Sequence, residues 1–535
     1  MDIPFSSLAL SLTQLYILIS VLTSLLLLHL VRQYIVPLFS PLRNLKHPPS
    51  PSWIWGNMLQ IFAAPSGELH REWEAEFGSV YAYRQLMNHA YTYPKPVAVQ
   101  RSLARAVGEG LLIAEGEVHK RQRRIMNPSF SPAEIRELTP IFWDKAGELR
   151  DIWVKELDQA AAGGANDLVI DICKWMSRAT LDIIGLAGFG YAFESLTDES
   201  NDLARAFSDL LILQRPSILI LLLNLIPGFT LLPIKRNRVA AHSRDTLRRT
   251  GMELVKLKKE AVRQTLDGKR DEQEIGRKQV AGRDLLTALV RANMANDLPD
   301  EGRLDDEQVL AQISTFLLAG HETTSTAVIW ALFALSKHQD VQTKLRKELQ
   351  RYPESMPGMD ELNNIPYLDW VVREVLRFHT PVGGTVRIAD ADDEIPVSTP
   401  YTDRHGVQRT SIPIKNGDGI YIPIKNVNRT PTLWGPDGES FNPERWAHVP
   451  EEATHIPGVW AHILSFLGGP RACIGYKFSV VEIKVFLYTI VREFEFEFAD
   501  KTMEFEERST IVTRPVIKGR VKEGPALPLR LRRAQ

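Results

Sequence analysis

Cysteine is scarce in this chain of 535 residues, which holds only Cys173 and Cys473. So few cysteines exclude a disulfide framework and fit a reducing compartment. An excess of charge of one sign is also lacking. The formal net charge is −1, so the overall charge predicts no nucleic-acid partner. The sequence has no internal repeat and no low-complexity linker, so we expect one large domain after the N-terminal segment.

Charged residues are absent from 8–31. A stretch of this length can cross a bilayer. Basic residues follow it and only Asp2 precedes it, so the positive-inside rule places the downstream chain in the cytosol. A cleaved signal peptide is the alternative, but the acidic start and long apolar stretch favour an uncleaved anchor. We therefore expect a short luminal terminus (1–7), a transmembrane helix (8–31), a basic, proline-rich hinge (32–52) and a cytosolic domain (53–535).

Apolar periodicity predicts a largely helical domain. Asp305 and Gln308 have the spacing of a capping box at the start of one long helix. The apolar segment 209–234 is interrupted by prolines, so we expect two helices joined by a loop that dips into the membrane surface. Helices are expected over 68–77, 116–128, 131–161, 167–186, 237–265 and 306–336, and an exposed loop over 267–282.

Strands are expected in three shorter regions. These are 79–98, the stretch from 382 to 424, and a terminal hairpin over 494–530 with its tip at 509–513. The predicted fold class is therefore mainly α with a minor β-sheet region.

Cys473 follows a glycine- and proline-rich loop, Phe466-Leu467-Gly468-Gly469-Pro470-Arg471-Ala472-Cys473-Ile474-Gly475, and precedes an apolar helical run. The N–H groups and the dipole of a helix start favour a thiolate. A lone thiolate in a rigid loop suits haem iron, whereas a buried structural cysteine is the alternative. The flanking residues match F-x-x-G-x-R-x-C-x-G. The chain thus resembles the membrane-anchored, microsomal members of the cytochrome P-450 family of haem-thiolate monooxygenases.

This resemblance implies the cytochrome P-450 fold and a haem b cofactor with Cys473 as the axial iron ligand. It also assigns roles to the loop around the cysteine. Phe466 and the loop amides would shield and bond the sulfur, and Arg471 would contact a haem propionate. Gly469 and Gly475 would let the backbone approach the ring.

The segment Ala319-Gly320-His321-Glu322-Thr323-Thr324 lies in the middle of the predicted helix over 306–336. Glycine costs about 1 kcal/mol there relative to alanine, and broken local rules often mark a functional site. Threonine hydroxyls can bond the carbonyl one turn back and open a groove; a kink in a packed helix is the alternative. The resemblance implies that O₂ occupies the groove at Gly320, that Thr323 assists proton delivery and that Glu322 relays protons. His321 is expected to be a neighbouring polar contact.

Glu374 and Arg377 are three residues apart on a predicted helix, a spacing that by itself indicates only a surface pair. Phe441-Asn442-Pro443-Glu444-Arg445-Trp446 follows later in the chain. This combination resembles the E-x-x-R and P-E-R-W motifs of the same family. The resemblance implies that Glu374, Arg377 and Arg445 form a structural network around the haem loop.

His119 and Arg123 are one turn apart on a basic helix. The resembling family usually has W-x-x-x-R here, with both residues on haem propionates, so His119 departs from the pattern but keeps a ring N–H. Arg387 is a second candidate for a propionate. A solvated basic face is the alternative, and basic residues not used by the haem could face an acidic electron-donor protein.

The resemblance implies a monooxygenase that inserts one oxygen atom of O₂ into a lipophilic small molecule, such as a terpenoid of secondary metabolism. Electrons would come from NADPH through a flavoprotein reductase, with cytochrome b5 as a further candidate donor. The membrane contacts would be 8–31 and 209–234, and the location the endoplasmic reticulum. The segment 396–411 is long and favours a fungal member. Expected pocket residues are Phe316, Ala319, Val382, Thr385 and Ile511.

Three other interpretations remain open at this stage. One is an isomerase or dehydratase of the same fold that works without a reductase. Another is a membrane-tethered haem binder without catalysis, and the third is a helical membrane scaffold without haem. A c-type cytochrome is excluded, because the chain has no C-x-x-C-H motif. Substrate, position of oxidation, number of steps, pathway and oligomeric state are not determined by the sequence.

Overall fold

The protein was analysed as a computed structural model. The structure describes residues 39–52, 56–77, 86, 87, 89–198, 206, 234–266, 284–294, 304–353, 355–509 and 511–534, with scattered positions between 13 and 35. The predicted segments 8–31, 209–234 and 267–282 lie largely or wholly outside these residues. Within the described part, no helix is long and apolar enough to span a bilayer.

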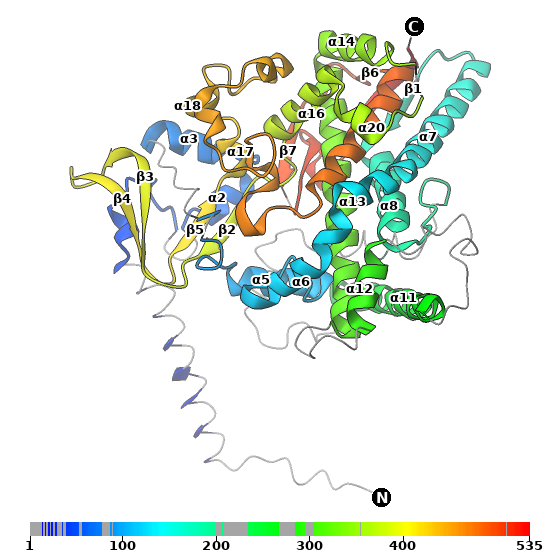
Figure 1. Cartoon of the computed structure of the whole chain (residues 1–535). Helices are drawn as coiled ribbons and strands as arrows, with labels where there is room; N and C mark the ends of the chain where they lie inside the picture. Colours follow the sequence, from blue (N-terminus) through cyan, green and yellow to red (C-terminus); the bar gives the residue numbers. More distant parts are fainter. Residues whose placement is uncertain are drawn as a thin grey trace, which may run out of the picture.

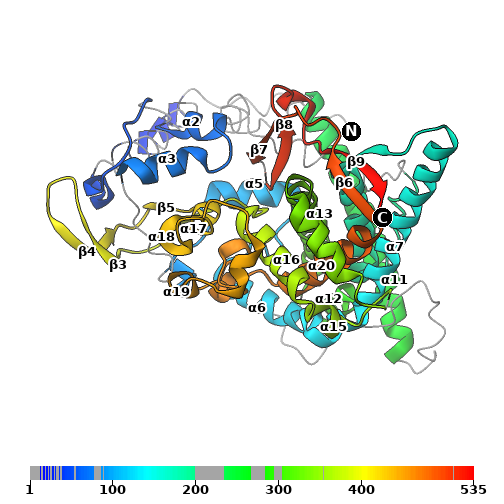
Figure 2. The same ribbon diagram turned by 90° about the horizontal axis from the view of Figure 1, so that it is seen from above.

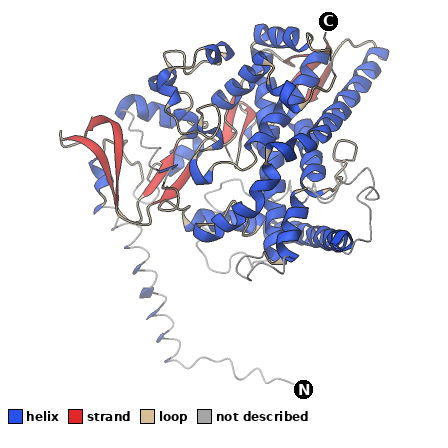
Figure 3. Cartoon of the chain, viewed as in Figure 1, coloured by secondary structure: helices blue, strands red, loops and turns tan. Residues whose placement is uncertain are grey.

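Helices fill most of the molecule, as Figures 1 and 3 show. Their bounds are α2 (Met58–Ala63), α3 (Glu68–Phe77), α5 (Val97–Val107), α6 (Gly116–Met126), α7 (Pro132–Ala162), α8 (Ile172–Phe189), α11 (Lys235–Leu266), α12 (Leu285–Met294), α13 (Asp306–Lys337), α14 (Gln339–Leu349), α15 (Met359–Asn363), α16 (Pro366–Phe378), α17 (Ile424–Val427), α18 (Pro431–Trp434), α19 (Glu451–Thr454) and α20 (Tyr476–Glu493). Short 3-10 turns connect several of them. They are η4 (Pro41–Asn44), η5 (Asn127–Phe130), η8 (Pro443–Ala447), η9 (Leu464–Phe466), η10 (Gly469–Arg471) and η11 (Val521–Glu523).

The strands form small antiparallel sheets rather than one large sheet. Their order is β1-β9-β6, β2-β5, β3-β4 and β7-β8. The bounds are β1 (Leu168–Asp171), β2 (Thr385–Ile388), β3 (Asp393–Thr402), β4 (Gln408–Ile414), β5 (Gly419–Ile422), β6 (Phe494–Phe498), β7 (Phe505–Ser509), β8 (Thr513–Ile517) and β9 (Pro528–Arg533). The expected class, mainly α with a minor β region, is confirmed.

The long helix α13 is the centre of the core. Most of its side chains are buried, and it packs on α8, α11, α20 and α16. Its start is fixed by the predicted capping box: Gln308 N donates to Asp305 Oδ1 at 2.7 Å, and Asp305 N donates to Gln308 Oε1 at 3.2 Å. In Figure 2, α13 and α20 lie in the middle of the helical part. This arrangement gives any site on α13 a rigid support.

Several predicted boundaries hold, and two are wrong. The helices expected over 68–77, 131–161 and 237–265 are α3, α7 and α11, and the hairpin tip at 509–513 joins β7 to β8. Residues 167–186 are not one helix, because β1 pairs with β9 before α8 begins. The strand expectation over 79–98 fails in its described part, where turns lead into α5. Residues 89–92 form turns, and 94–96 has no regular structure before α5 begins at Val97.

The long connection 396–411 forms most of the β3–β4 hairpin, which extends away from the helical part at the left of Figure 1. The chain segment that follows the N-terminal region packs against it. Ser40 Oγ donates to Asp418 Oδ2 at 2.9 Å, and Arg404 N donates to Asn44 O at 2.9 Å. These bonds attach residues 40–44 to the domain.

Candidate active site

The cysteine loop is held by its own backbone. Cys473 N donates to Phe466 O at 2.8 Å, and Ala472 N donates to Gly469 O at 3.1 Å. Leu467 and Gly469 both have positive φ, 55° and 64°. A Cβ at Gly469 would lie 2.2 Å from Met87 O, so only glycine fits this position. The loop therefore delivers the cysteine to the start of α20 in a single geometry.

Cys473 is exposed as a residue. Protein atoms nevertheless surround its thiol closely, and this burial raises the pKa of the thiol. The backbone N–H of Gly475 and the charge of Arg123 oppose that rise. A Cβ at Gly475 would lie 3.6 Å from the Phe130 ring, which is an ordinary contact distance, so packing does not require glycine here. The contribution of Gly475 is its N–H donor. A metal ion would take the thiol as a thiolate, since cysteine ligands bind deprotonated.

Phe466 is buried beside this loop. Its ring lies edge-on to Trp460, with 5.8 Å between centroids, and 6.0 Å from the Tyr476 ring. The Trp460 and Tyr476 rings therefore pack against Phe466 at the loop.

On α13, an open stripe runs through an otherwise buried helix. Ala319, Gly320 and Thr323 are partly exposed, whereas the residues around them are buried. Thr323 Oγ1 donates to Ala319 O at 2.6 Å, which is the bond one turn back that the sequence predicted. Thr324 Oγ1 lies 3.0 Å from Ser479 Oγ on α20, so the stripe sits close to the helix that begins just after Cys473.

Gly320 has a packing role that the sequence did not reveal. A Cβ at this position would lie 2.7 Å from Cγ1 and 2.9 Å from Cδ1 of Ile184 on α8. The glycine therefore allows α8 and α13 to approach closely beside the stripe.

We expect Gly320→Ala to destabilise the fold by about 1–3 kcal/mol, because overpacking of a tight contact costs that much. The measurement is the urea midpoint of unfolding. The double variant Gly320→Ala/Ile184→Val removes one of the clashing methyl groups and should recover part of the loss. No recovery would contradict this role of Gly320.

The carboxylate of Glu322 is held by two partners and is not a free proton relay. Arg514 Nη2 of β8 donates to Glu322 Oε2 at 2.7 Å, and His321 Nε2 lies 3.2 Å from Glu322 Oε1. Burial would raise the pKa of Glu322, but Arg514 and His321 together lower it to about 2. Sequence reasoning missed Arg514, since 192 positions separate it from Glu322 and no local pattern marks it.

A cluster of buried and half-buried basic side chains lies around the cysteine loop. Arg123 Nη1 donates to Ala472 O at 2.6 Å, and Arg471 pairs with Glu115. Arg387 Nη1 donates to Val386 O at 2.7 Å. Among the described residues, neither Arg123 nor Arg387 has an ion-pair partner.

Three members of this cluster were not predicted. Lys95 Nζ lies 3.1 Å from Glu115 Oε1, and Tyr91 Oη lies 3.0 Å from His119 Nδ1. Burial, together with Arg471 and Arg387, lowers the pKa of Lys95 to about 7. Burial, Lys95 and Arg123 lower the pKa of His119 to about 4. The turn before α5 brings Lys95 here, and tertiary placement of that kind is invisible in the sequence.

The charge balance of this cluster fits an anionic group. Within the part of the chain that the structure describes, the four basic side chains of Lys95, Arg123, Arg387 and Arg471 gather near one carboxylate, Glu115, which pairs only with Lys95 and Arg471. Buried like charges without partners are costly. Two propionates of a haem held at Cys473 would supply the missing negative charge, so the residues present fit that cofactor.

Glu374, Arg377 and Arg445 meet in the structure. Arg377 Nε and Nη2 donate to the two oxygens of Glu374 at 2.8 and 2.7 Å, and Arg445 Nε donates to Glu374 Oε1 at 3.2 Å. Trp446 Nε1 donates to Glu374 Oε2 at 3.1 Å. Arg377 also donates to three backbone carbonyls, those of Asn428, Gly438 and Ser440. This buried network joins α16 to the segment that leads into the cysteine loop.

Apart from Ala319, which lies in the stripe, the four expected pocket residues have different surroundings. Phe316 stacks on Phe130 with centroids 5.4 Å apart. Ile511 packs on the cluster around Leu318 of α13, so the hairpin tip contacts that helix next to the stripe in sequence. Val382 packs on the main core. The hydroxyl of Thr385 accepts from Arg387 Nη1 at 2.8 Å, which assigns it to the cation cluster as well.

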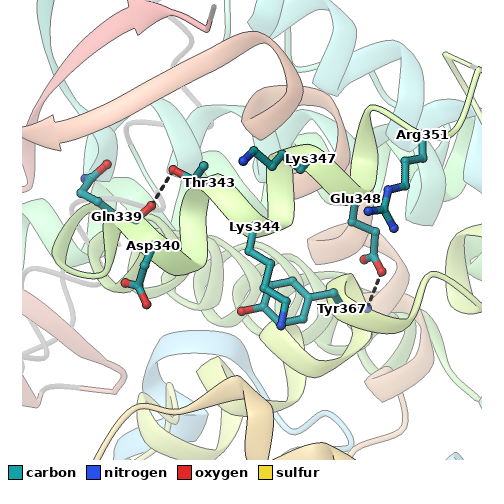
Figure 4. Close-up of a pocket in the computed structure, with 8 residues that line it drawn as sticks. All are labelled: Gln339, Asp340, Thr343, Lys344, Lys347, Glu348, Arg351 and Tyr367. Carbon is teal, nitrogen blue, oxygen red and sulfur yellow. Dashed lines mark hydrogen bonds between the residues drawn. The ribbon is translucent and has the colours of Figure 1, made fainter.

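A pocket at the surface is lined by neither Cys473 nor Thr323. It runs along α14 and reaches Tyr367 at the start of α16 (Figure 4). Lys344 bonds Glu444 there at 2.6 Å and lies over the Tyr367 ring. Lys344 and Glu444 are exposed and charged, whereas Tyr367 is buried, and no residue of the cysteine loop lines this pocket.

Comparison with known proteins agrees with this geometry. Residues 47–521 match the family model described as Cytochrome P450. The chain is 46% identical over 511 residues to Cytochrome P450 monooxygenase 205 of Postia placenta, with 92% of each chain covered. It is 42% identical to Cytochrome P450 monooxygenase 128 of the same fungus, with 93% and 94% covered. It is 36% identical to Cytochrome P450 monooxygenase claP of Ampulloclitocybe clavipes, with 88% and 89% covered.

The chain therefore belongs to the cytochrome P450 family, and it is a cytochrome P450 monooxygenase that uses haem. The resemblance to the cytochrome P-450 family is confirmed, and so is the similarity to fungal members.

Proposed function

We propose that this monooxygenase carries haem b on Cys473 and inserts one oxygen atom of O₂ into a lipophilic small molecule. The haem supplies the oxygen activation and the one-electron chemistry. In the overall reaction a substrate C–H bond becomes C–OH, and the second oxygen atom leaves as water after uptake of two electrons and two protons. The observation that carries the proposal is the placement of the Cys473 loop and the Ala319–Thr323 stripe on neighbouring helices.

The residues of the chain have separate tasks in this proposal. Cys473 binds the iron, and the N–H of Gly475 stabilises its thiolate. Arg123, Arg387, Arg471 and Lys95 hold the propionates, and His119 assists them. Thr323 orients a water molecule or a proton in the stripe, and Phe466 keeps bulk water from the sulfur.

Electrons are proposed to come from NADPH through a flavoprotein reductase, with cytochrome b5 as a second donor. Support comes from α6, whose residues Lys120 and Arg124 are exposed while His119 on the same helix is buried. Exposed cations beside the haem side of the protein suit an acidic electron-donor partner, and they speed its encounter.

The substrate is proposed to be apolar and terpenoid-like, since Phe316, Ala319, Val382 and Ile511 are apolar. We also propose that residues 8–31 anchor the protein in the endoplasmic reticulum membrane, with the catalytic domain in the cytosol and a second contact through 209–234. The charge-free length of 8–31 and the basic residues after it support this orientation.

The test is turnover in microsomes that contain the full chain and a reductase, with terpenoid, polyketide and fatty-acid panels read by mass spectrometry. We expect a product that is heavier by one oxygen atom, derived from ¹⁸O₂ and dependent on NADPH. A product formed without reductase would indicate the isomerase or dehydratase alternative. Absence of any spectral change with lipophilic ligands would count against the proposed substrate class.

Arg387→Gln is expected to weaken haem binding by about 10–100-fold, the usual cost of losing an outer-shell partner of a metal site. The reason is that the variant removes a buried cation that has no ion-pair partner among the described residues. Haem retention is measured by transfer of haem to apomyoglobin. Arg136→Gln, which breaks an exposed pair with Asp360, is the control and should retain haem like the wild type.

A further inference from the structure

Two buried polar side chains of α13 have no hydrogen-bond partner in the part of the chain that the structure describes. They are Gln312, through Nε2, and Thr315, through Oγ1, and these residues are 0% and 3% exposed. Other threonines of this helix are bonded: Thr323 and Thr326 each donate to the carbonyl four positions earlier, at 2.6 and 2.7 Å. A buried donor without an acceptor is costly, so the two exceptions require a physical explanation.

The orientation of the Gln312 amide is fixed by the backbone. Leu111 N donates to Gln312 Oε1 at 2.9 Å. Because a backbone N–H can only donate, the atom that it meets is the amide oxygen, and the remaining atom is the NH₂ group. Nε2 of Gln312 and the hydroxyl of Thr315 therefore both carry hydrogens that lack an acceptor among the described residues. One oxygen atom placed between them could satisfy both side chains.

These two side chains share a helix face with the open stripe of the candidate active site. Residues three or four positions apart lie on the same face of a helix. Gln312, Thr315, Ala319 and Thr323 follow one another at these spacings. At the rise of an α-helix, Thr315 and Gln312 are about 6 and 10 Å before Ala319 along the axis. A single small molecule can therefore contact the pair at one end and the stripe at the other.

The surroundings of the pair are apolar. Aliphatic side chains from α13, from α5 and the connection that follows it, and from the tip of the β7–β8 hairpin gather there: Leu318, Val107, Ile113 and Ile511. Gly110, in the connection between α5 and α6, lies directly over Thr315, since a Cβ on this glycine would be 2.2 Å from Thr315 Oγ1. A charged group would be poorly solvated in such surroundings, so the acceptor that suits them is uncharged. Gly110 has to yield when this acceptor enters.

We propose that Gln312 and Thr315 are specificity-determining residues that bind a neutral oxygen atom of the substrate, that of an alcohol or a ketone. The inference rests on the proposed monooxygenase function and deepens it, because it names the substrate class as an oxygen-bearing lipophile rather than a plain hydrocarbon. A ketone oxygen accepts from both side chains, whereas an alcohol accepts from Gln312 and donates to the Thr315 oxygen. The apolar part of the molecule then extends along the stripe toward Thr323. A hydrocarbon leaves the donors unbonded and is bound less tightly.

The first experiment needs no ligand. In the full-length holoenzyme, Thr315→Val replaces the hydroxyl with a methyl group of similar size, and urea unfolding gives the midpoint. Since the hydroxyl has no partner among the described residues, we expect the midpoint to stay at the wild-type value or to rise. Thr139→Val on α7 is the matched control, because Thr139 is also buried but donates to Ile135 O at 2.8 Å; its midpoint should fall. An equal fall in Thr315→Val would mean that a protein group or a trapped water molecule already bonds the hydroxyl, and it would overturn the proposal.

The second experiment measures the preference for oxygen. The probes form two sets, each a hydrocarbon, an alcohol and a ketone on one carbon skeleton: limonene, carveol and carvone, and valencene, nootkatol and nootkatone. Spectral titration of the full-length holoenzyme gives the dissociation constants. We expect the wild type to bind an oxygenated member of a set about tenfold more tightly than the hydrocarbon.

Variants then assign the preference to the pair. Thr315→Val and Gln312→Met should each reduce the preference by about threefold or more. Thr315→Ser keeps a hydroxyl and should retain the preference, and Thr139→Val should match the wild type. Equal affinity of the wild type for all members of both sets, or an unchanged preference in Thr315→Val and Gln312→Met, would overturn the proposal.

The outcomes separate this inference from the proposed function. NADPH-dependent product without a preference for oxygen retains the monooxygenase and rejects the polar pair. A preference without NADPH-dependent product retains the pair and rejects the monooxygenase. If no probe binds, the terpenoid-like substrate class is rejected, and the unfolding midpoint of Thr315→Val still decides whether the pair lacks an acceptor.

Discussion

Replacing Cys473 with serine is expected to remove the strongly red-shifted absorption of the reduced carbonyl adduct and to lower product formation by more than about 100-fold. That exceeds the roughly 10–100-fold effect of losing an outer-shell partner, because the iron loses its ligand itself. A serine oxygen is a much poorer donor of electron density to iron than a thiolate. The measurement combines the carbonyl difference spectrum with turnover by the microsomal enzyme.

Cys173→Ala is the matched control for this prediction. Cys173 is buried near the start of α8, where burial raises the pKa of its thiol and keeps it neutral. We expect the carbonyl spectrum of this variant to equal that of the wild type. Retention of the red-shifted band in Cys473→Ser would remove the basis of the proposed function.

Glu374→Gln is expected to reduce the free energy of unfolding by about 3–5 kcal/mol, because removal of one partner strands the remaining buried charges. Arg377 and Arg445 are both buried, and both bond the Glu374 carboxylate. The carboxylate also accepts from the backbone N–H of Asn442 at 2.7 Å and from Trp446 Nε1. Urea unfolding, followed by tryptophan fluorescence at constant haem occupancy, measures the loss.

Glu444→Gln is the control for the same chemical change at an exposed site. Glu444 bonds Lys344 at 2.6 Å, and the two side chains are 50% and 54% exposed; Lys344 is drawn in Figure 4. Exposed pairs contribute about 0–1 kcal/mol, so this variant should unfold close to the wild-type midpoint. Equal losses in the two variants would show that burial of the Glu374 network adds nothing to stability.

Much of the helical architecture could be predicted from local patterns. The capping box at Asp305 and the periodicity of α3, α7 and α11 gave correct helices, since each signal depends on neighbours within a few residues. The strand β1 was missed because it is only four residues long and exists through its pairing with β9, more than 350 positions later. Pairing of that kind has no local signature.

The residues of the candidate site also fall into two groups, those that local motifs predicted and those that they did not. Motifs pointed to Cys473, Thr323 and Glu374, and the structure places each in contacts that suit its proposed role. Lys95 and Arg514 were missed, because isolated basic residues in a sequence are indistinguishable from solvated ones. Their proximity to buried charges of opposite or equal sign appears only after the chain has folded.

The sequence by itself determined the family and the mainly helical class and pointed to the cysteine that we propose as the haem ligand, because those depend on residue type and short spacing. Tertiary structure alone decided that Gly320 serves the packing of α8 and that four basic side chains gather near one carboxylate. It also decided that Arg514 pairs with Glu322 and lowers the pKa of its carboxyl group. The physical reason is that burial and charge pairing between distant segments set these properties, and a linear pattern carries no information about either.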